Sequence, residues 1–426
     1  MNQDMTRGQR GLLLFALIFA GEAIFTLPYH VTRFFRPTFL DVFELSATEL
    51  GVAQSTYGIV AVVAYFLGGP LADRIKPQNL LAGSLGITAL GGLYLASFPS
   101  KAGLAILWAF FGASTILLFW ASLIKVTRTW GGQGQQGLAY GMLDGGRGLV
   151  AALLASAGVM AFSMAFPAGY ESTTLEQKAE ILRRVIYGYT SVTALAGLLI
   201  WWCLRALPDN AVTNSLPLAQ TFKQMAQILR MKTVWLQAIV LLCAYTSYKA
   251  FDQYALFAVR GHGLDEVTAA QIVAVGVWTR PVAALLLGLI GDRLGISRVA
   301  LCCFVLLACS HALFAFTGTV LGTASMVLMN TLVTGIAIFG LRGLYFGLLE
   351  EGQVPLALTG TAVGWVSVIG YLPDIYIGAV AGYLIDHSPG LAGFQHLFIL
   401  LLGFTLVGAV AAALFQRQAH ALGSNG

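Results

Sequence analysis

Charged side chains interrupt the long apolar stretches of this chain. Asp144 and Arg147 stand three residues apart within the run from Gly141 to Phe162, and Lys249 and Asp252 repeat that spacing in a later run. Residues three apart on a helix can touch, so each couple can form an ion pair. A charge at the centre of a membrane costs about 2.5–3.5 kcal/mol even on the insertion scale, so such residues usually face a cavity or a partner. Two interpretations stay open: each couple neutralises itself, or it serves a ligand.

Arg280 differs from these couples, because it has no acidic neighbour within one helical turn. Arginine binds carboxylate and phosphate groups through two parallel hydrogen bonds. Two guanidinium groups at one cavity repel each other unless an anion or Glu22 lies between them. Arg147 and Arg280 are therefore candidate ligands for a small organic anion, with Lys249 or Arg342 assisting.

Glu22 is the first candidate for proton coupling, since it falls near the middle of the first apolar stretch. Burial disfavours the charged form of a carboxyl group, whereas an approaching arginine favours it. The arrival of an anionic ligand can therefore release or capture a proton. The alternative is a permanent ion pair between Glu22 and Arg147. Asp144, Asp252 and Asp374 are further proton-coupling candidates.

Three aromatic residues adjoin these polar positions and are candidates for contact with a substrate. Tyr29 precedes His30, Tyr248 precedes Lys249, and Trp278 lies two residues before Arg280. His30 itself is interpreted as a satisfied polar residue rather than a ligand. Pro281 and Pro373 stand next to Arg280 and Asp374, and each proline is expected to bend its helix beside a charge.

The composition indicates a membrane protein. Of the 426 residues, 58% are hydrophobic and 10% are charged, whereas a soluble domain carries roughly 25% charged residues. A membrane-spanning helix needs about 20 predominantly apolar residues, and membrane strands alternate in shorter segments of about ten. We therefore expect an all-α protein with twelve transmembrane helices, near residues 11–32, 49–72, 79–98, 102–127, 137–166, 186–207, 233–259, 268–291, 297–318, 321–349, 357–385 and 393–416.

The placement of lysine and arginine sets the expected orientation. More of them fall in the segments that share a side with the N-terminus, which predicts that both termini are cytoplasmic. The run from 11 to 32 is long for a signal peptide and no cleavage site follows it, so it is expected to stay as the first span. The expected location is the cell membrane, in bacteria the inner membrane.

The chain divides into two similar halves. "GGPLADRIKP" ends the second span and "LGLIGDRLGISR" ends the eighth, which places Asp73 and Asp292 219 positions apart. The same offset relates Gly141 to Gly360, and a repeated offset favours a duplication. The predicted parts are a six-helix bundle over 1–207, a cytoplasmic linker with a short amphipathic helix over 208–232, and a second six-helix bundle over 233–426.

These features together resemble the major facilitator superfamily. The resemblance implies two pseudo-symmetric bundles with a site between them near the bilayer midplane, and alternating access by rocking of the halves. It also implies that the loop residues Asp73, Arg74, Asp292 and Arg293 latch one conformation. At a finer level, "DGGRGL" and the segment from Arg342 to Asp386 look like bacterial permeases for small organic anions, including sugar-phosphate and sulfo-sugar permeases.

Glycine-rich segments complete the transporter expectation. "GMLDGGRG" and "GTAVGWVSVIGY" place small residues three or four positions apart, which lets helices approach closely. "TTLEQKAEILRRVIYGY" carries the spacing of a capping box, with Thr173 and Glu176. It predicts a helix that starts outside the membrane, and the role of this extension near Thr173–Arg184 stays open.

Other classes of function find little support. No metal-ligand spacing, catalytic constellation or basic run for nucleic acid occurs, and the five cysteines lie in apolar stretches. We therefore expect no enzyme, no cofactor and no nucleic-acid partner, but a monomer in the lipid bilayer that binds a small molecule. The expected function is secondary transport, as a symporter or antiporter with a co-transported proton, or by exchange. The alternatives are a proton-driven efflux pump for hydrophobic or sugar-like compounds and a transporter-like sensor.

Overall fold

The computed structural model describes residues 6–131, 136–165, 173–205, 228–317, 323–354, 359–388 and 390–423. All regular elements within these ranges are helices. The predicted linker over 208–232 lies outside them except for its last five residues, so its amphipathic helix stays a prediction. The helices, including short π and 3-10 turns, are α1 (Arg7–Ala23), η1 (Thr26–His30), α2 (Val31–Phe34), α3 (Arg36–Val42), α4 (Ala47–Arg74), α5 (Pro77–Ala96), α6 (Lys101–Gly112), η2 (Ala113–Trp120), α7 (Ala121–Gly131), α8 (Gln136–Met164), α9 (Leu175–Leu204), α11 (Lys232–Ala250), η4 (Phe251–Gln253), α12 (Tyr254–Leu256), η5 (Phe257–Gly261), α13 (Glu266–Val277), α14 (Thr279–Leu294), α15 (Ile296–Phe316), α16 (Thr323–Leu344), α17 (Leu348–Glu351), α18 (Thr359–Gly370), α19 (Pro373–Asp386) and α20 (Leu391–Gly423).

Eleven helical segments of the described chain are long and apolar enough to cross a membrane. They correspond to eleven of the predicted spans. The remaining predicted span, 49–72, falls on α4, a helix of 28 residues that lies in the same bundle. The chain is therefore a multi-pass membrane protein, and the number of twelve spans stays a prediction.

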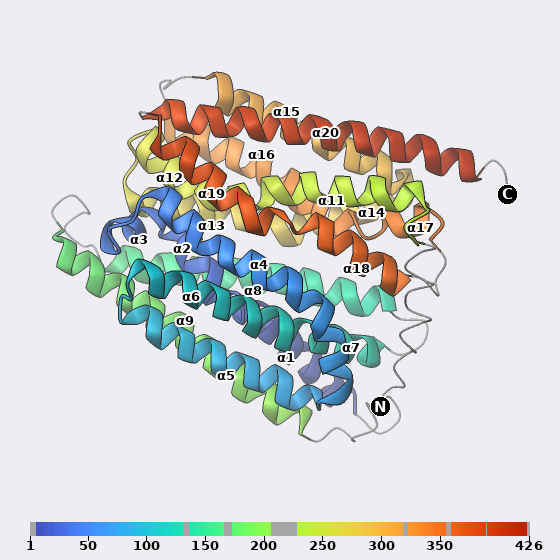
Figure 1. The fold of residues 1–426 in the computed structure, drawn as a ribbon, viewed down its shortest axis with the longest axis horizontal. Coiled ribbons are helices and arrows are strands. Elements are labelled where there is room, and N and C mark those ends of the chain that lie inside the picture. The colour runs from blue at the N-terminus through green and yellow to red at the C-terminus, as the bar shows by residue number, and fades with distance from the viewer. Residues whose placement is uncertain are drawn as a thin grey trace.

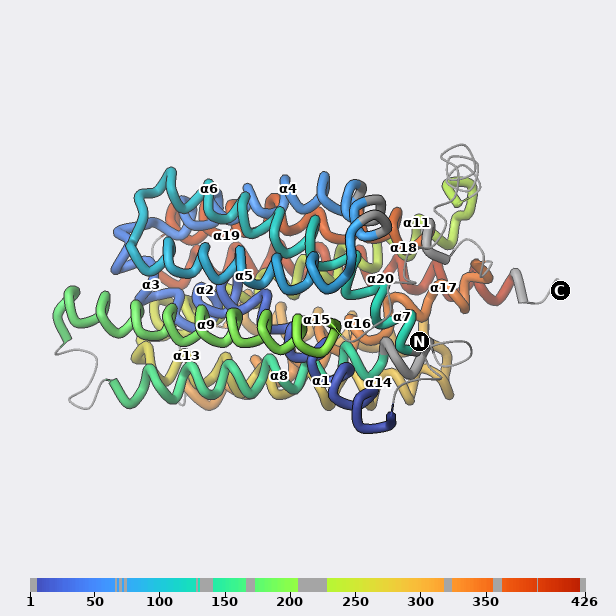
Figure 2. Tube along the Cα trace, turned by 90° about the horizontal axis from the view of Figure 1, so that it is seen from below, coloured from blue at the N-terminus to red at the C-terminus, as the bar shows by residue number. Residues whose placement is uncertain are grey.

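The helices of the first half of the chain lie beside one another, and those of the second half form the other side of the bundle (Figure 1). Three sets of helix contacts join the sides: α4 packs along α19, α8 packs against α13 and α14, and α2 and α3 pack against the segment η4–α12 and α13. Helix α1 starts and α20 ends at the same end of the bundle, whereas α3 lies at the opposite end (Figure 2). We call these the terminal end and the far end.

The joint between α4 and α19 is close enough that glycine is required. A Cβ atom on Gly51 would lie 2.1 Å from the carbonyl oxygen of Gly378, and one on Gly382 would lie 2.4 Å from the carbonyl oxygen of Ala47. The predicted glycine segments also bring helices together, since a Cβ on Gly146 would lie 2.6 Å from Ile18. A side chain at Gly51 or Gly382 would therefore clash with the facing backbone. Because these positions lack side chains, the backbones of the two halves come into contact at the far-end half of this joint.

Several spans are broken at mid-length. The first span passes from α1 through a π-turn to α2, the eighth breaks at Trp278, and α19 begins at Pro373. Pro281 lies in the first turn of α14 and Pro373 at the start of α19, where a missing backbone N–H removes no helical hydrogen bond. The structure therefore shows a helix start, rather than a bend within one helix, beside Arg280 and beside Asp374.

The helix expected after Thr173 is present, but its cap is one residue later than predicted. Helix α9 begins at Leu175, and its N-cap is Thr174, whose hydroxyl accepts from the Gln177 backbone N–H. The Gln177 side chain accepts from the Thr174 N–H at 2.9 Å in return. Two overlapping residue pairs have the capping-box spacing, Thr173 with Glu176 and Thr174 with Gln177. The second pair forms the box, and Glu176 lies in the first turn of the helix.

Candidate transport site

A cavity lies between the two sides of the bundle, where the spans are broken. Its walls come from α1, η1 and α2 on one side and from α11, α14, α16 and α19 on the other, with contributions from α4 and α8. The basic residues that line it are Arg33, Arg147, Lys249, Arg280 and Arg342, and the carboxylates that line it are Glu22 and Asp374. The cavity wall thus carries more positive than negative charge.

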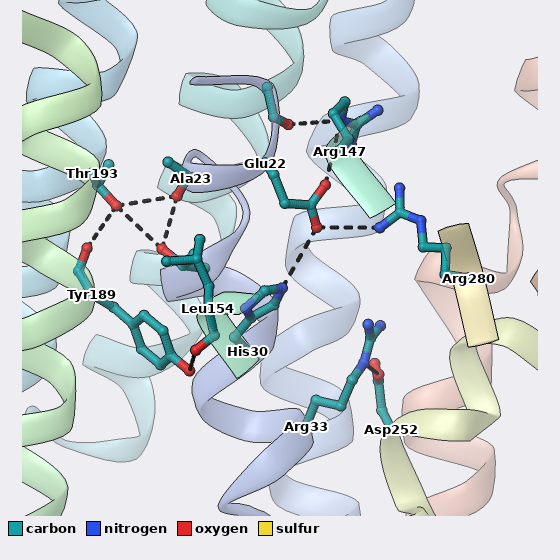
Figure 3. Close-up of polar contacts among 12 residues, drawn as sticks. Glu22, Ala23, His30, Arg33, Arg147, Leu154, Tyr189, Thr193, Asp252 and Arg280 are labelled. Carbon is teal, nitrogen blue, oxygen red and sulfur yellow. Dashed lines mark hydrogen bonds and ion pairs between the residues drawn. The ribbon is translucent and has the colours of Figure 1, made fainter. Parts of the chain in front are cut away.

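Glu22 lies between two arginines from different halves of the chain (Figure 3). Its Oε1 atom is 3.3 Å from Nη1 of Arg280 and its Oε2 atom is 3.4 Å from Nε of Arg147. Nε2 of His30 lies 3.6 Å from Oε1, and the Glu22 side chain is only 5% exposed. The carboxylate therefore separates two guanidinium groups that would otherwise repel each other.

Asp144 adds a second, weaker neutralising contact to this cluster. Its Oδ1 atom lies 3.8 Å from Arg147 and 3.7 Å from Arg280, and its side chain is 42% exposed. Arg147 is also fixed by a backbone contact, since its Nε donates to the carbonyl oxygen of Gly21 at 3.0 Å. The Arg147 and Arg280 guanidinium groups thus share two carboxylates, one buried and one partly open to solvent.

Lys249 joins two further carboxylates at the far-end side of the cavity. Its Nζ atom lies 3.4 Å from Asp252 and 3.2 Å from Asp374, and it lies 4.0 Å from the ring centroid of Tyr29. The Tyr245 hydroxyl donates to Asp374 at 3.1 Å. The predicted pair of Lys249 and Asp252 forms, and Lys249 also contacts Asp374 on the neighbouring helix α19.

Arg342 has a different environment. Its guanidinium carbon lies 4.1 Å from the ring centroid of Tyr248 and 6.0 Å from that of Tyr245. Within the described part of the chain no carboxylate lies within 4 Å of it, and its buried Nε atom has no hydrogen-bond partner. The aromatic face holds the guanidinium in place, and the charge of Asp144 acts on it only from beyond ion-pair distance.

The remaining wall is aromatic and carries hydroxyl groups. The rings of Tyr29 and Tyr57 meet edge to face with their centroids 5.1 Å apart, and the ring of Tyr65 stacks on that of Tyr371 with the centroids 5.8 Å apart. Tyr245 contacts Tyr371 at 4.7 Å. The other residues of the described lining include Phe25, Trp120 and a single aliphatic side chain, Ile116. Such a wall can form hydrogen bonds with a ligand that carries hydroxyl or other polar groups.

The structure brings most of the predicted site residues to this one cavity. Those that line it are Arg147, Arg280, Lys249, Arg342, Tyr29, Tyr248, Glu22 and Asp374, and Asp144 and Asp252 contact them. Trp278 does not line the cavity. Trp278 is 38% exposed, and its Nε1–H donates to the Ser156 hydroxyl at 2.8 Å.

Arg33 and His30 also line the cavity, although neither is among the predicted site residues. A signal was available in the repeat, because "YHVTR" (29–33) and "YKAFD" (248–252) share a tyrosine, a basic residue and a charged residue at the same offset of 219. Arg33 and Asp252 hold matching places in the two halves, and they meet, with Nε of Arg33 2.5 Å from Oδ1 of Asp252.

Contacts between the halves close the far end. Besides Arg33 and Asp252, the hydroxyl of Thr38 donates to Glu266, and the Thr48 N–H and hydroxyl each donate to Asp386 at 2.6 Å. The predicted latch lies at the other end. Asp292 and Arg293 are exposed there and have no ion pair within the described chain, and the side chains of Asp73 and Arg74 lie outside the description. The latch therefore stays a prediction.

Metal binding has no support in the described residues, where no three His, Cys, Asp or Glu side chains gather in a way that could hold an ion. The cavity chemistry is instead that of guanidinium, ammonium, carboxylate and phenol groups.

Comparisons with known proteins agree with this architecture. The profile of the Major Facilitator Superfamily matches residues 11–376. Inner membrane protein YqcE of Escherichia coli is 26% identical over 96% of this chain and 95% of its own length, and inner membrane protein YihN of the same organism is 26% identical over 95% of both. A bacterial homologue of the human lysosomal transporter Spinster, in an inward-facing and unoccupied conformation, superposes with a TM-score of 0.75 at 13% identity, covering 97% of this chain and 98% of that one. The nucleoside transporter NupG gives a TM-score of 0.70 at 15% identity, covering 95% of this chain and 98% of that one.

Proposed function

Since the chain belongs to the Major Facilitator Superfamily and is therefore a secondary transporter, we propose that its cargo is a small organic anion with a carboxylate, phosphate or sulfonate group. The cargo binds in the cavity between the two halves. Transport proceeds by alternating access, in which the halves rock about the central site.

Arg342 is the observation that carries the anion proposal. It lines the cavity, and within the described chain no carboxylate lies within 4 Å of it. Its Nε atom has no hydrogen-bond partner. A buried charge without a partner is costly, and an anionic ligand with good geometry offsets that cost. The planar fork of arginine also matches the shape of the three anionic groups named above.

The wall supports a cargo with a polar body rather than a hydrophobic one. Tyrosines from both halves of the chain place phenol groups around the cavity: Tyr29, Tyr57 and Tyr65 from the first half, and Tyr245, Tyr248 and Tyr371 from the second. Phenol rings offer an apolar face together with a hydroxyl that forms hydrogen bonds. The efflux of purely hydrophobic compounds is therefore less favoured than the transport of a hydroxylated anion.

Proton coupling through Glu22 is the second part of the proposal. An anionic cargo that takes Arg147 or Arg280 away from Glu22 removes a positive charge from a buried carboxylate, which then favours its protonated form. Asp374 is placed for a similar exchange, because Lys249 and Tyr245 hold it. Both carboxylates face the cavity, so a proton can travel with the cargo.

The conformation follows from the predicted orientation. If both termini are cytoplasmic, the far end faces outward, and its contacts close the cavity on that side. The structure is then closed toward the outside, as an inward-facing state requires. Opening the far end requires separation of Arg33 from Asp252 and of Thr48 from Asp386.

The experiment is a transport screen with labelled organic anions on protein reconstituted in liposomes, with and without a pH gradient. We expect uptake of one class of anion, its loss in Arg342→Gln, and its persistence in Arg184→Gln, a change at an exposed surface arginine. Uptake that an imposed gradient leaves unchanged and that survives Glu22→Gln would remove the proton role. Uptake of neutral compounds alone would contradict the anion proposal.

A further inference from the structure

Arg33 and Arg36 lie three residues apart in the sequence, at the far end of the bundle. Arg33 lies in α2 and Arg36 is the first residue of α3. Arg33 is 5% exposed and Arg36 is fully buried. Both lie where the first span meets the other half of the chain, because α2 packs against η4, α12 and α13, and α3 packs against α12.

The two guanidinium groups differ in their partners. Arg33 donates to Asp252 and lies 5.0 Å from the ring centroid of Tyr248. All three nitrogens of the Arg36 guanidinium, in contrast, have no hydrogen-bond partner. Burial lowers the pKa of Arg36 to about 10, although Asp252 and Asp386 partly oppose that effect.

A buried guanidinium without an acceptor disfavours the conformation that buries it. Its loss of hydration is costly in a protein interior unless hydrogen bonds and opposite charge compensate. The charged groups that act on Arg36 from the other half are Asp252, Asp386 and Arg260. Separation of the halves at the far end would expose Arg36 to water, and it would also free Arg33 from Asp252.

We propose that Arg33 and Arg36 form an anion-binding site at the far end, exposed only when the halves separate there, which takes the anionic group of the cargo before it reaches the cavity. The ligand class is a carboxylate, phosphate or sulfonate. Arg33 also lines the cavity, so the site leads directly into it. The inference rests on the proposed function for the charge of the cargo, and it adds a second place of contact.

The site also affects the conformational equilibrium. A ligand that binds only one of two states shifts the population toward that state. An anion on Arg33 and Arg36 therefore holds the far end open, and closure requires that the anion move inward. Asp252 then replaces the anion on Arg33, while Arg36 is left without a replacement. The far-end site is thus a place of capture rather than of lasting binding.

The test compares how fast an introduced cysteine reacts with an anionic and with a cationic thiol reagent. It can therefore be done before the cargo is identified. Thr38→Cys is placed in a background without the five native cysteines, and purified protein in nanodiscs reacts with methanethiosulfonate reagents that carry either a sulfonate or a trimethylammonium group. Arg36→Gln is compared with Arg184→Gln, which removes an exposed charge of the same kind at the same end. Thr38→Cys is present in every protein compared.

We expect the ratio of the anionic to the cationic rate to fall by roughly tenfold in Arg36→Gln, since a charged recess raises the local concentration of the opposite ion. Arg184→Gln and Arg342→Gln are expected to leave the ratio unchanged. An equal ratio in Arg36→Gln and its parent overturns the proposal, and so does a thiol at position 38 that reacts with neither reagent. Because Arg342→Gln loses cargo binding but keeps the ratio, failure of this inference and failure of the proposed function are distinguishable.

A second variant guards against a purely structural role. Arg36→Leu removes the charge and keeps an apolar side chain in the same place, and its melting temperature is expected to rise because a buried unpaired charge is removed. A fall in melting temperature would show that Arg36 stabilises the closed end, which contradicts the argument above.

Discussion

Apart from Arg33, which pairs with Asp252 at the far end, the arginines that line the cavity fall into two groups that differ in which groups lie next to their charge. Arg147 and Arg280 share the buried carboxylate of Glu22 and the half-exposed carboxylate of Asp144. Arg342 lies on the face of Tyr248, and within the described chain no carboxylate lies within 4 Å of it. The protein therefore supplies its own counter-ion at one place and leaves the other for a ligand. Affinity for an anion should depend most on Arg342, and coupling should depend most on Glu22.

Replacement of Arg342 should have the largest effect. Truncation of one member of a buried, hydrogen-bonded charge pair costs about 2–5 kcal/mol, or roughly 30-fold and more in affinity. We expect Arg342→Gln to weaken equilibrium binding of a transported anion by that amount, and Arg342→Lys to retain part of it, because an ammonium keeps the charge but not the fork. An unaltered dissociation constant in Arg342→Gln would remove the distinction between the two groups.

Replacement of Glu22 should leave the positive charges of Arg147 and Arg280 without their buried counter-ion. Glu22→Gln leaves Arg147 and Arg280 without their shared buried carboxylate, which should lower the melting temperature. Added organic anion should restore it and should bind more tightly than to the wild type. The double variant with Arg280→Gln serves as the control, since it removes one positive charge and should recover stability without anion. A stable Glu22→Gln variant that is insensitive to anion would contradict this account.

Replacement of Tyr248 should have a smaller effect. A cation over an aromatic face gains about 0.5–2 kcal/mol, so Tyr248→Leu should weaken anion binding by roughly 2- to 30-fold. Tyr248→Phe keeps the ring beneath Arg342 and should stay near the wild type in the same titration. Equal loss in both variants would instead point to the hydroxyl group as the contact.

Replacement of Trp278 should have the smallest effect. The ring lies outside the cavity lining and its N–H is used by Ser156. Trp278→Phe should therefore leave the dissociation constant for the anion unchanged, with at most a modest loss of stability in a thermal melt. A marked loss of affinity would return Trp278 to the site and show that the cavity changes shape in the bound state.

The fold followed from the sequence more fully than the site did. Apolar runs of membrane length indicate helices directly, because no other unpaired element satisfies its backbone in lipid. The couples Asp144–Arg147 and Lys249–Asp252 were also accessible, since their contact depends on local helical spacing. The location of breaks beside Pro281 and Pro373 could be predicted because a proline acts on the backbone of its own helix.

Contacts between distant parts of the chain could not be predicted from spacing. Glu22 and Arg280 are 258 positions apart, and only the arrangement of the halves brings them together. Trp278 does not line the cavity, because residues two apart on a helix point to different sides, and its nearness to Arg280 in sequence carried no information about the cavity. Arg33 was missed because the first span was ended one residue before it, although η1 and α2 continue that span.

The charge of Arg342 is tested most directly by comparing one transported acid with its uncharged amide analogue, titrated by calorimetry into the wild type and Arg342→Gln. The account predicts that the wild type binds the acid far more tightly than the amide, and that Arg342→Gln binds the two alike. Equal binding of acid and amide by the wild type, or a preference for the acid that survives in Arg342→Gln, would contradict it.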